Sequence, residues 1–344
     1  MQRLKSKLGI LLLLSLVIMV GCSNNASNNE QTEASLATSE ATSEEVTTEE
    51  ETTEEVLIEK IKIVASLFPH YDFARTIAGE FGDVTLLLPP GIESHSFEPT
   101  PRDIISIMDA KIFIYTNELM EPWAHAMIEN VDSNQTAIVD LSVNIELLKF
   151  DDDHDHVDSD DHGHEGEYDP HYWLDLNNAV IMVETIKEAL IEAMPEQRDI
   201  FEANAAQLSM ALIELDNAFF DMAKHVQSKT ILSGRHFAFG YFASRYGFDH
   251  KSPYKGFSPD AEPTPRNIAA LINTIKTTNA KAIFFEELIE PRVANIISEE
   301  ANVELLLLHG AHNVSKDELA SNTTYLEIMT GNLERLKKGL GYNE

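Results

Sequence analysis

The strongest constraint on the fold is one long helical face in the middle of the chain. Seven large apolar residues recur at spacings of 7, 4, 3, 4, 3 and 4: Phe201, Leu208, Leu212, Leu215, Phe219, Met222 and Val226. These intervals keep all seven side chains on one side of an α-helix. The spacing predicts a linking helix within residues 195–227, roughly 45 Å long at about 1.5 Å per residue. Such a helix is either a rigid strut between two lobes or an ordinary core helix.

Short apolar runs alternate with helical patterns on both sides of this helix. Before it, the runs predict strands at residues 61–67, 84–88, 111–116 and 137–140, and helices at 72–78, 101–109 and, capped by Asn177 or Asn178, up to 193. After it, they predict strands at 229–233, 281–285 and 303–308, and helices at 268–275 and 325–336. This alternation is typical of an α/β fold with a mostly parallel sheet.

The length of 344 residues exceeds what a single core usually holds. We therefore predict two α/β lobes, at residues 57–194 and 228–344, each with a mostly parallel sheet flanked by helices. The linking helix bridges them and leaves a cleft between the lobes. Ligands of such sheets bind beyond the carboxyl ends of the strands.

The first residues predict an export signal. Arg3 and Lys5 precede a run at 8–20 that is almost entirely apolar, too short for a comfortable membrane span but suited to a signal-peptide core. A glycine then precedes Cys22, the only cysteine of the chain, and this junction resembles a bacterial lipobox. We expect residues 1–21 to be removed and Cys22 to be lipidated, so that the protein is anchored to the cell membrane on its extracytoplasmic side. An ordinary signal peptide or an anchor helix is the alternative.

Residues 22–56 predict a disordered acidic tether. After Cys22 this segment carries ten glutamates and no lysine or arginine, and it cannot bury enough apolar surface to order itself. The whole chain has a formal net charge of −33. A charge of this sign is repelled by phosphate backbones, which excludes nucleic acid as a partner. A single cysteine also excludes an intramolecular disulfide.

Histidines follow several predicted strands. His95, His171 and His236 stand at strand ends that would face the cleft, and His309 follows the last strand. Neutral imidazoles are good zinc ligands, so these positions indicate a metal site, although any one of them alone is more often a capping or core histidine. Glu286 and Glu287 also follow a strand, either as partners that orient an imidazole or as residues that start a helix.

A second group of histidines lies in a run of carboxylates at 151–168. Its members are His154, His156, His162 and His164. A run of this composition cannot pack into a core and predicts a solvated loop. The interleaved histidines indicate a weak accessory metal-binding loop, with a plain acidic surface loop as the alternative.

Several separate motifs together resemble one known family. They are G-x-x-x-H-x-x-E-P-x-P at 91–101, E-P-W at 121–123, D-P-H-x-W-L at 169–174, G-x-H at 234–236 and P-D-A-E-P at 259–263. With the lipobox and the His-rich loop, they occur in the order found in zinc-type solute-binding proteins of bacterial ABC importers, the cluster A-I metal-binding proteins. The resemblance covers about residue 61 to the C-terminus.

The resemblance implies a metal site at the lobe interface, with Zn²⁺ as the bound ion and an ABC permease as the partner. It carries over His95, His171 and His236 as ligands. The fourth position, often Asp in the family, falls near His309 here. The fourth ligand is therefore His309, His312, Glu93 or a water.

The function predicted is binding of Zn²⁺ outside the cytoplasm and its delivery to the permease, by a monomer that performs no chemical step. Three alternatives stay open: a manganese- or iron-type member of the same family, a zinc-dependent hydrolase and a surface adhesin. The chain has no His-Glu-x-x-His motif, which disfavours a zincin protease. A hydrolase would also need a general base, and none is evident.

Overall fold

The computed structural model of the chain describes residues 59–149, 168–235, 237–254, 263–288 and 290–343. Several predictions lie outside the described residues: the signal peptide, Cys22, the acidic tether, the loop with His154, His156, His162 and His164, the first four residues of the P-D-A-E-P motif, and His236. Residues Val56–Glu344 form one compact unit. None of the helices in the described part of the chain has both the length and the apolar character needed to cross a bilayer.

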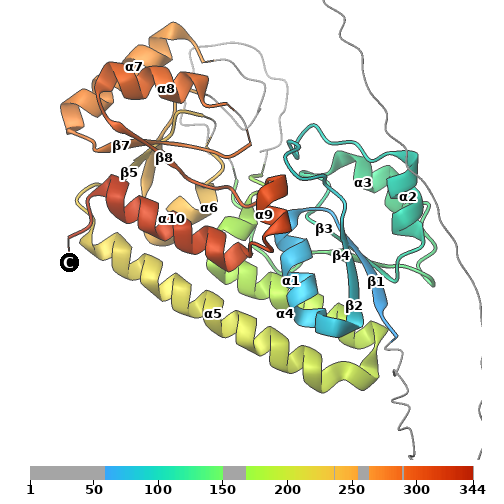
Figure 1. Cartoon of the computed structure of the whole chain (residues 1–344). Coiled ribbons are helices and arrows are strands. Elements are labelled where there is room, and N and C mark those ends of the chain that lie inside the picture. The colour runs from blue at the N-terminus through green and yellow to red at the C-terminus, as the bar shows by residue number, and fades with distance from the viewer. Residues whose placement is uncertain (1–58, 150–167, 236, 255–262, 289, 344) are drawn as a thin grey trace, which may run out of the picture. The chain divides into compact units, whose positions relative to one another are not determined.

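The N-terminal lobe is built on a parallel sheet of four strands in the order β2-β1-β3-β4 (Figure 1). The strands are β1 (Ile61–Ala65), β2 (Gly82–Leu86), β3 (Ile112–Tyr115) and β4 (Ala137–Asp140). Side chains of β3 alternate between the two faces of the sheet. Ile112 and Ile114 join the core shared with α1 (Phe68–Ala78) and α4 (Leu176–Ala193), while Phe113 and Tyr115 pack with residues of α2 (Pro101–Met108) and α3 (Pro122–Ile128).

The C-terminal lobe holds two parallel strand pairs joined by a bridge between Ser233 and Phe284. The pairs are β5 (Thr230–Leu232) with β6 (Asp249–Lys251), and β7 (Ala282–Phe285) with β8 (Glu304–Leu307). The helices are α6 (Gly240–Tyr246), α7 (Pro265–Thr278), α8 (Arg292–Ala301), α9 (Lys316–Ala320) and α10 (Tyr325–Leu340). Residues of α7 and α8 pack with Ile283, whereas residues of α10 pack with Phe284, so opposite faces of β7 are covered.

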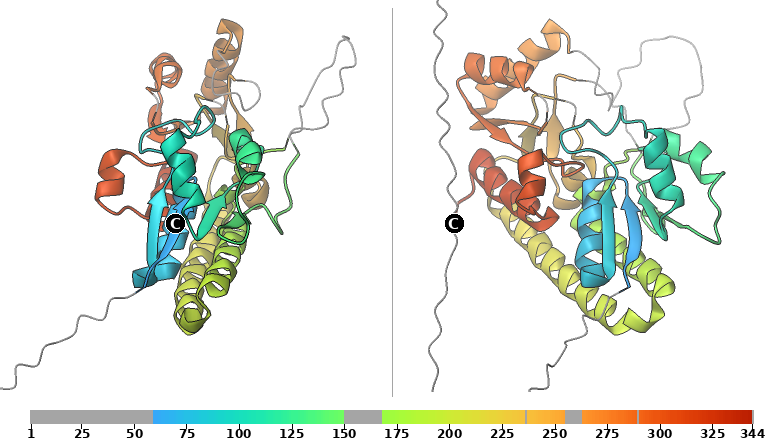
Figure 2. Two further views of the ribbon diagram at one scale, coloured as in Figure 1. Left: turned by 90° about the vertical axis from the view of Figure 1, so that its right-hand side faces the viewer. Right: turned by 45° about the vertical axis from the view of Figure 1, so that its right-hand side comes forward.

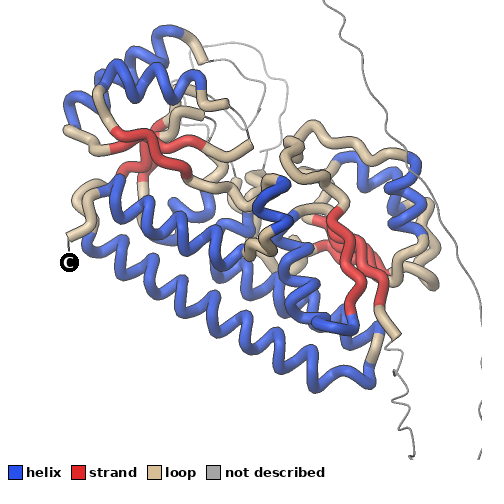
Figure 3. The backbone as a smooth tube through the Cα atoms, in the orientation of Figure 1, coloured by secondary structure: helices blue, strands red, loops and turns tan. Residues whose placement is uncertain are grey.

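The predicted long helix is α5 (Arg198–His225), which follows a short 3-10 turn at Pro195–Gln197. Its 28 residues span about 42 Å. All seven residues of the predicted apolar face are buried. The helix contacts α1 and α4 of the N-terminal lobe and α6 and α10 of the C-terminal lobe. Figure 2 shows α4 and α5 side by side. Figure 3 shows the strands in two separate groups along this helix. The helix is therefore both a core helix and the connection between the lobes.

The α/β class with parallel sheets flanked by helices and one long helix is confirmed, although the C-terminal lobe has two two-stranded sheets linked by a bridge in place of one sheet. One detail was wrong: α4 is capped by Asp175, whose side chain accepts the Asn177 N–H, and not by Asn177 or Asn178. Strand β6 and helices α3, α6, α8 and α9 were not predicted, because each is too short for a clear hydrophobic period or lies next to proline. The exact lobe boundaries stay a prediction.

Candidate metal centre

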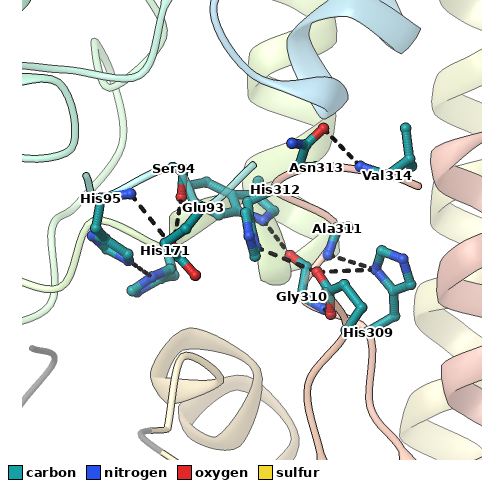
Figure 4. A network of polar contacts seen from close by, with 12 residues as sticks. Glu93, Ser94, His95, His171, His309, Gly310, Ala311, His312, Asn313 and Val314 are labelled. Carbon is teal, nitrogen blue, oxygen red and sulfur yellow. Dashed lines mark hydrogen bonds and ion pairs between the residues drawn. The ribbon is translucent and has the colours of Figure 1, made fainter. Parts of the chain in front are cut away.

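Two of the predicted ligands meet directly. His95 lies on the loop between β2 and α2, and His171 immediately precedes the 3-10 turn Tyr172–Leu174. Their Nε2 atoms are 3.2 Å apart, and the rings meet edge to face (Figure 4). Two nitrogens bound to one tetrahedral zinc at about 2.0–2.1 Å stand about 3.3 Å from each other. The pair therefore already has the separation of one edge of a zinc tetrahedron.

His171 is held by a carboxylate of its own segment. Asp169 Oδ1 lies 2.7 Å from His171 Nδ1 and accepts the His171 backbone N–H at 2.9 Å. Asp169 is itself fixed, because its N–H donates to Leu148 O and its carbonyl accepts from the Tyr241 hydroxyl, both at 2.9 Å. A carboxylate at Nδ1 sets the tautomer and leaves the Nε2 lone pair for a metal. The D-P-H part of the motif thus encodes a ligand together with its support.

The aromatic residues after His171 tie its segment to both lobes. Tyr172 donates its hydroxyl to Thr116 O at 2.8 Å, and Trp173 donates Nε1–H to Gly310 O at 2.8 Å. Both side chains are fully buried. Glu121, from the E-P-W motif, accepts the Thr116 N–H at 2.7 Å, and burial raises the pKa of this carboxyl to about 7. The ends of β3 and β8 are thereby joined through the His171 segment.

A third histidine, His312, lies near the His95–His171 pair (Figure 4). Its Nδ1 lies 3.4 Å from Glu287 Oε1, and its Nε2 is buried without a hydrogen-bond partner in the described part of the chain. Burial lowers the pKa of His312, and the ring also interacts electrostatically with Glu93 and His171. Figure 4 shows His312 between the His95–His171 pair and His309. A neutral buried imidazole with an open Nε2 has the chemistry of a zinc ligand.

His309 faces another way, although it is only three residues from His312. Its Nδ1 accepts the Ala311 N–H at 3.0 Å and lies 3.3 Å from Glu287 Oε1, while its Nε2 faces Glu318 Oε1 at 3.6 Å. Burial disfavours the charged ring, but the carboxylates of Glu287 and Glu318 outweigh it and raise the pKa of His309. Because Nδ1 accepts a hydrogen bond, the neutral ring carries its proton on Nε2, the nitrogen that faces Glu318, and this environment disfavours His309 as a ligand.

Glu93 is a carboxylate close to the paired histidines. Its Oε1 accepts the His95 N–H at 3.4 Å, and its Oε2 lies 3.8 Å from Arg235 Nη2. Burial raises the pKa of Glu93, but His312, His95 and Arg235 act against it and the net shift is downward. Glu93 is therefore ionised. Burial also lowers the pKa of His95, to about 4, which keeps this ring neutral near pH 7.

The structure thus brings His95 and His171 together, turns His312 toward them and turns His309 away; His236 lies outside the described residues. Among the residues that are described, no group of three or more His, Cys, Asp or Glu side chains surrounds a single ion position. Sequence reasoning missed the role of Asp169, whose place two residues before His171 was a local signal. It placed Glu287 beside an imidazole but could not show that two rings share this carboxylate.

The sequence matches, over residues 63–339, the family described as "Zinc-uptake complex component A periplasmic" (ZnuA). The chain belongs to this family of metal-uptake binding proteins. The match includes every element from β1 almost to the end of α10.

Relatives and solved structures agree with the family. The zinc-binding protein AdcA of Streptococcus pyogenes serotype M3 is 34% identical over 288 residues, which cover 81% of this chain and 56% of AdcA. The chain thus spans little more than half of that relative. The high-affinity zinc uptake system protein ZnuA of Bacillus subtilis is 33% identical over 283 residues, covering 82% of this chain and 88% of that protein. The Zn(II)-bound ZnuA-like domain of Streptococcus pneumoniae AdcA superposes with a TM-score of 0.69 at 31% identity, over 82% of this chain and 99% of that domain.

Proposed function

We propose that this chain binds Zn²⁺ outside the cytoplasm and delivers it to an ABC permease for uptake. The observation that carries the proposal is the Nε2–Nε2 separation of 3.2 Å between His95 and His171, which matches one edge of a zinc tetrahedron. His236, from the G-x-H motif, is the third ligand. The names of the relatives, which are zinc-binding and zinc-uptake proteins, support the choice of cargo.

We propose His312 as the fourth ligand, in preference to His309, Glu93 or a water. The Nε2 atoms of both rings are buried without a hydrogen-bond partner among the described residues. His312 has a lowered pKa, whereas His309 Nδ1 accepts the Ala311 N–H and its Nε2 lies 3.6 Å from the Glu318 carboxylate. Four neutral imidazoles form a nitrogen-rich site, which suits zinc better than manganese.

The remaining parts of the proposal concern location and transport. A lipidated Cys22 would hold the protein at the outer face of the membrane, and the acidic tether would let the folded unit reach the permease. The His-rich loop at 151–168 would collect metal weakly beside the site. The protein would perform no chemical step, since its task is to hold the ion until docking releases it.

Metal analysis of the full-length protein purified without chelator tests the proposal. We expect close to one tightly bound zinc per chain, with little manganese. Competition titration of the His95→Ala, His171→Ala and His236→Ala variants should then show weaker zinc binding in each. A protein that carries no zinc and takes up none would refute the function, and wild-type affinity in one variant would remove that residue from the site.

The hydrolase alternative is tested by activity assays. The zinc-loaded protein should not hydrolyse model esters or peptides above the rate of free Zn²⁺. Turnover that is lost in the His171→Ala variant would show that the site is catalytic.

A further inference from the structure

One ion pair joins the two lobes beside the candidate metal centre. Glu93 lies on the loop after β2, and Arg235 lies on the loop after β5. Arg235 Nη2 is 3.8 Å from Glu93 Oε2, and the side chains are only 13% and 21% exposed, respectively. An ion pair that is partly shielded from water is screened less than a surface pair.

The main chain of Arg235 is fixed by the strands beneath it. Its N–H donates to Ser233 Oγ at 3.2 Å, and its carbonyl accepts from the hydroxyls of Ser233 and Ser252. Ser233 N–H in turn donates to Lys251 O at the end of β6. The position of Arg235 is therefore a consequence of the β5–β6 pairing rather than of a loose surface loop.

Glu93 is a charged neighbour of the histidines of the candidate centre. Its charge acts on both His95 and His312, and Figure 4 shows it between these two rings. Within the described residues its Oε1 accepts two long hydrogen bonds, from the His95 N–H at 3.4 Å and from the Ser94 hydroxyl at 3.5 Å. These contacts are too weak to hold a carboxylate against a nearby divalent cation. The guanidinium of Arg235, which is always charged, lies 3.8 Å from its other oxygen.

We propose that Arg235 is a selectivity residue: it pairs with Glu93 across the two lobes and withholds that carboxylate from the metal, so that the ion meets imidazole nitrogens only. This inference rests on the proposed function. An all-nitrogen set favours Zn²⁺, whereas a carboxylate oxygen is the harder donor and favours Mn²⁺. Release of Glu93 from Arg235 should therefore improve manganese binding more than zinc binding.

The ratio of two dissociation constants isolates this effect. Removal of a positive charge near the site strengthens the binding of any divalent ion, and to a similar extent for Zn²⁺ and Mn²⁺ because their charges are equal. A change in the ratio of the manganese to the zinc dissociation constant therefore reports a change in ligands rather than in charge.

The experiment measures both constants by chelator competition in the full-length protein and five variants. Arg235→Gln should lower the manganese-to-zinc ratio about tenfold, equivalent to about 1.4 kcal/mol. Arg235→Lys keeps a point charge and should stay near wild type. Glu93→Gln alone removes a negative charge and should weaken Zn²⁺ and Mn²⁺ binding to a similar extent, which leaves the ratio unchanged. The Arg235→Gln/Glu93→Gln double variant should also have the wild-type ratio. Arg292→Gln removes an exposed arginine of α8 that pairs with Glu290, and serves as the control.

Three results would overturn the inference while leaving the zinc function intact. They are an unchanged ratio in folded Arg235→Gln, a shifted ratio that persists in the double variant, and a shifted ratio in Glu93→Gln alone, which would make Glu93 a ligand already. Failure of the wild-type protein to bind zinc would refute the proposed function and this inference with it. If Arg235→Gln does not fold, Arg235→Ala is measured in its place, with the same expected fall in the ratio.

Discussion

Asp169 and Glu287 each lie against the Nδ1 atom of a candidate ligand, one on each side of the site. The contact from Asp169 to His171 is 2.7 Å, and the contact from Glu287 to His312 is 3.4 Å. Asp169 contacts the imidazole of His171, which is two residues further along the chain. Glu287 comes from the loop after β7 and its Oε1 is shared with His309 at 3.3 Å, while its Oε2 accepts the Gly310 N–H at 2.7 Å.

The comparison indicates that the two sides of the site differ in rigidity. The Asp169 side has a short, dedicated contact and a carboxylate whose main chain is fixed by two hydrogen bonds. The Glu287 side divides one carboxylate oxygen between two rings at longer distance. We therefore expect the His171 side to hold the metal position and the His312 side to yield first when metal is released.

The largest expected effect is on the rigid side. His171→Ala should weaken zinc binding by at least about a hundredfold, because loss of a ligand costs more than the roughly 10–100-fold of losing an outer partner. Competition titration measures it. His225→Ala is the matched control, since this histidine is exposed at the end of α5. A loss of zinc affinity no larger than that of the control would show that His171 is not a ligand.

The second prediction separates the two histidines that share Glu287. His312→Ala should weaken zinc binding about tenfold or more, whereas His309→Ala should weaken it only a few-fold, since His309 acts through Glu287 alone. Cobalt substitution adds a spectroscopic check: only His312→Ala should alter the absorption bands of a tetrahedral Co²⁺ site. The reverse order would restore His309 as the fourth ligand.

The third prediction compares the two carboxylates themselves. Asp169→Asn should weaken zinc binding about tenfold, because the amide can no longer hold the correct tautomer of His171. Glu287→Gln should cost only a few-fold, because its contact with His312 is long and shared. Equal losses, measured by the same titration, would show that the difference in distance has no energetic consequence.

The difference between a local pair, Asp169 and His171, and a distant pair, Glu287 and His312, also explains how much of the site could be predicted from sequence. His171 and its support stand within three residues, so the D-P-H motif contains both, and the structure brings His171 beside His95. His312 and Glu287 are separated by a whole helix and strand, and which of two nearby histidines faces inward depends on the backbone after β8. Periodicity predicted α5 and most strands, since burial on one face leaves a regular pattern. It could not predict that Arg235 and Glu93 meet, because no local pattern links those loops.

The smallest expected effect on zinc affinity comes from deleting the His-rich loop, which lies next to Asp169 in the sequence. The His-rich loop joins Lys149 to Tyr168, which form an antiparallel bridge, and Asp169 N–H donates to Leu148 O at 2.9 Å. These contacts hold both ends of the loop independently of what lies between them. Replacement of residues 151–165 by a short glycine-serine linker should therefore leave Asp169 and His171 in place and keep the tight zinc affinity within about twofold. Titration should lose only weaker binding events, since loop histidines among carboxylates bind metal loosely and at several positions.

A variant with four histidine-to-serine changes, at His154, His156, His162 and His164, separates loss of ligands from loss of loop. If the deletion but not the serine variant abolished tight binding, the loop would support Asp169 mechanically, and the rigidity of this side would depend on more than its two hydrogen bonds.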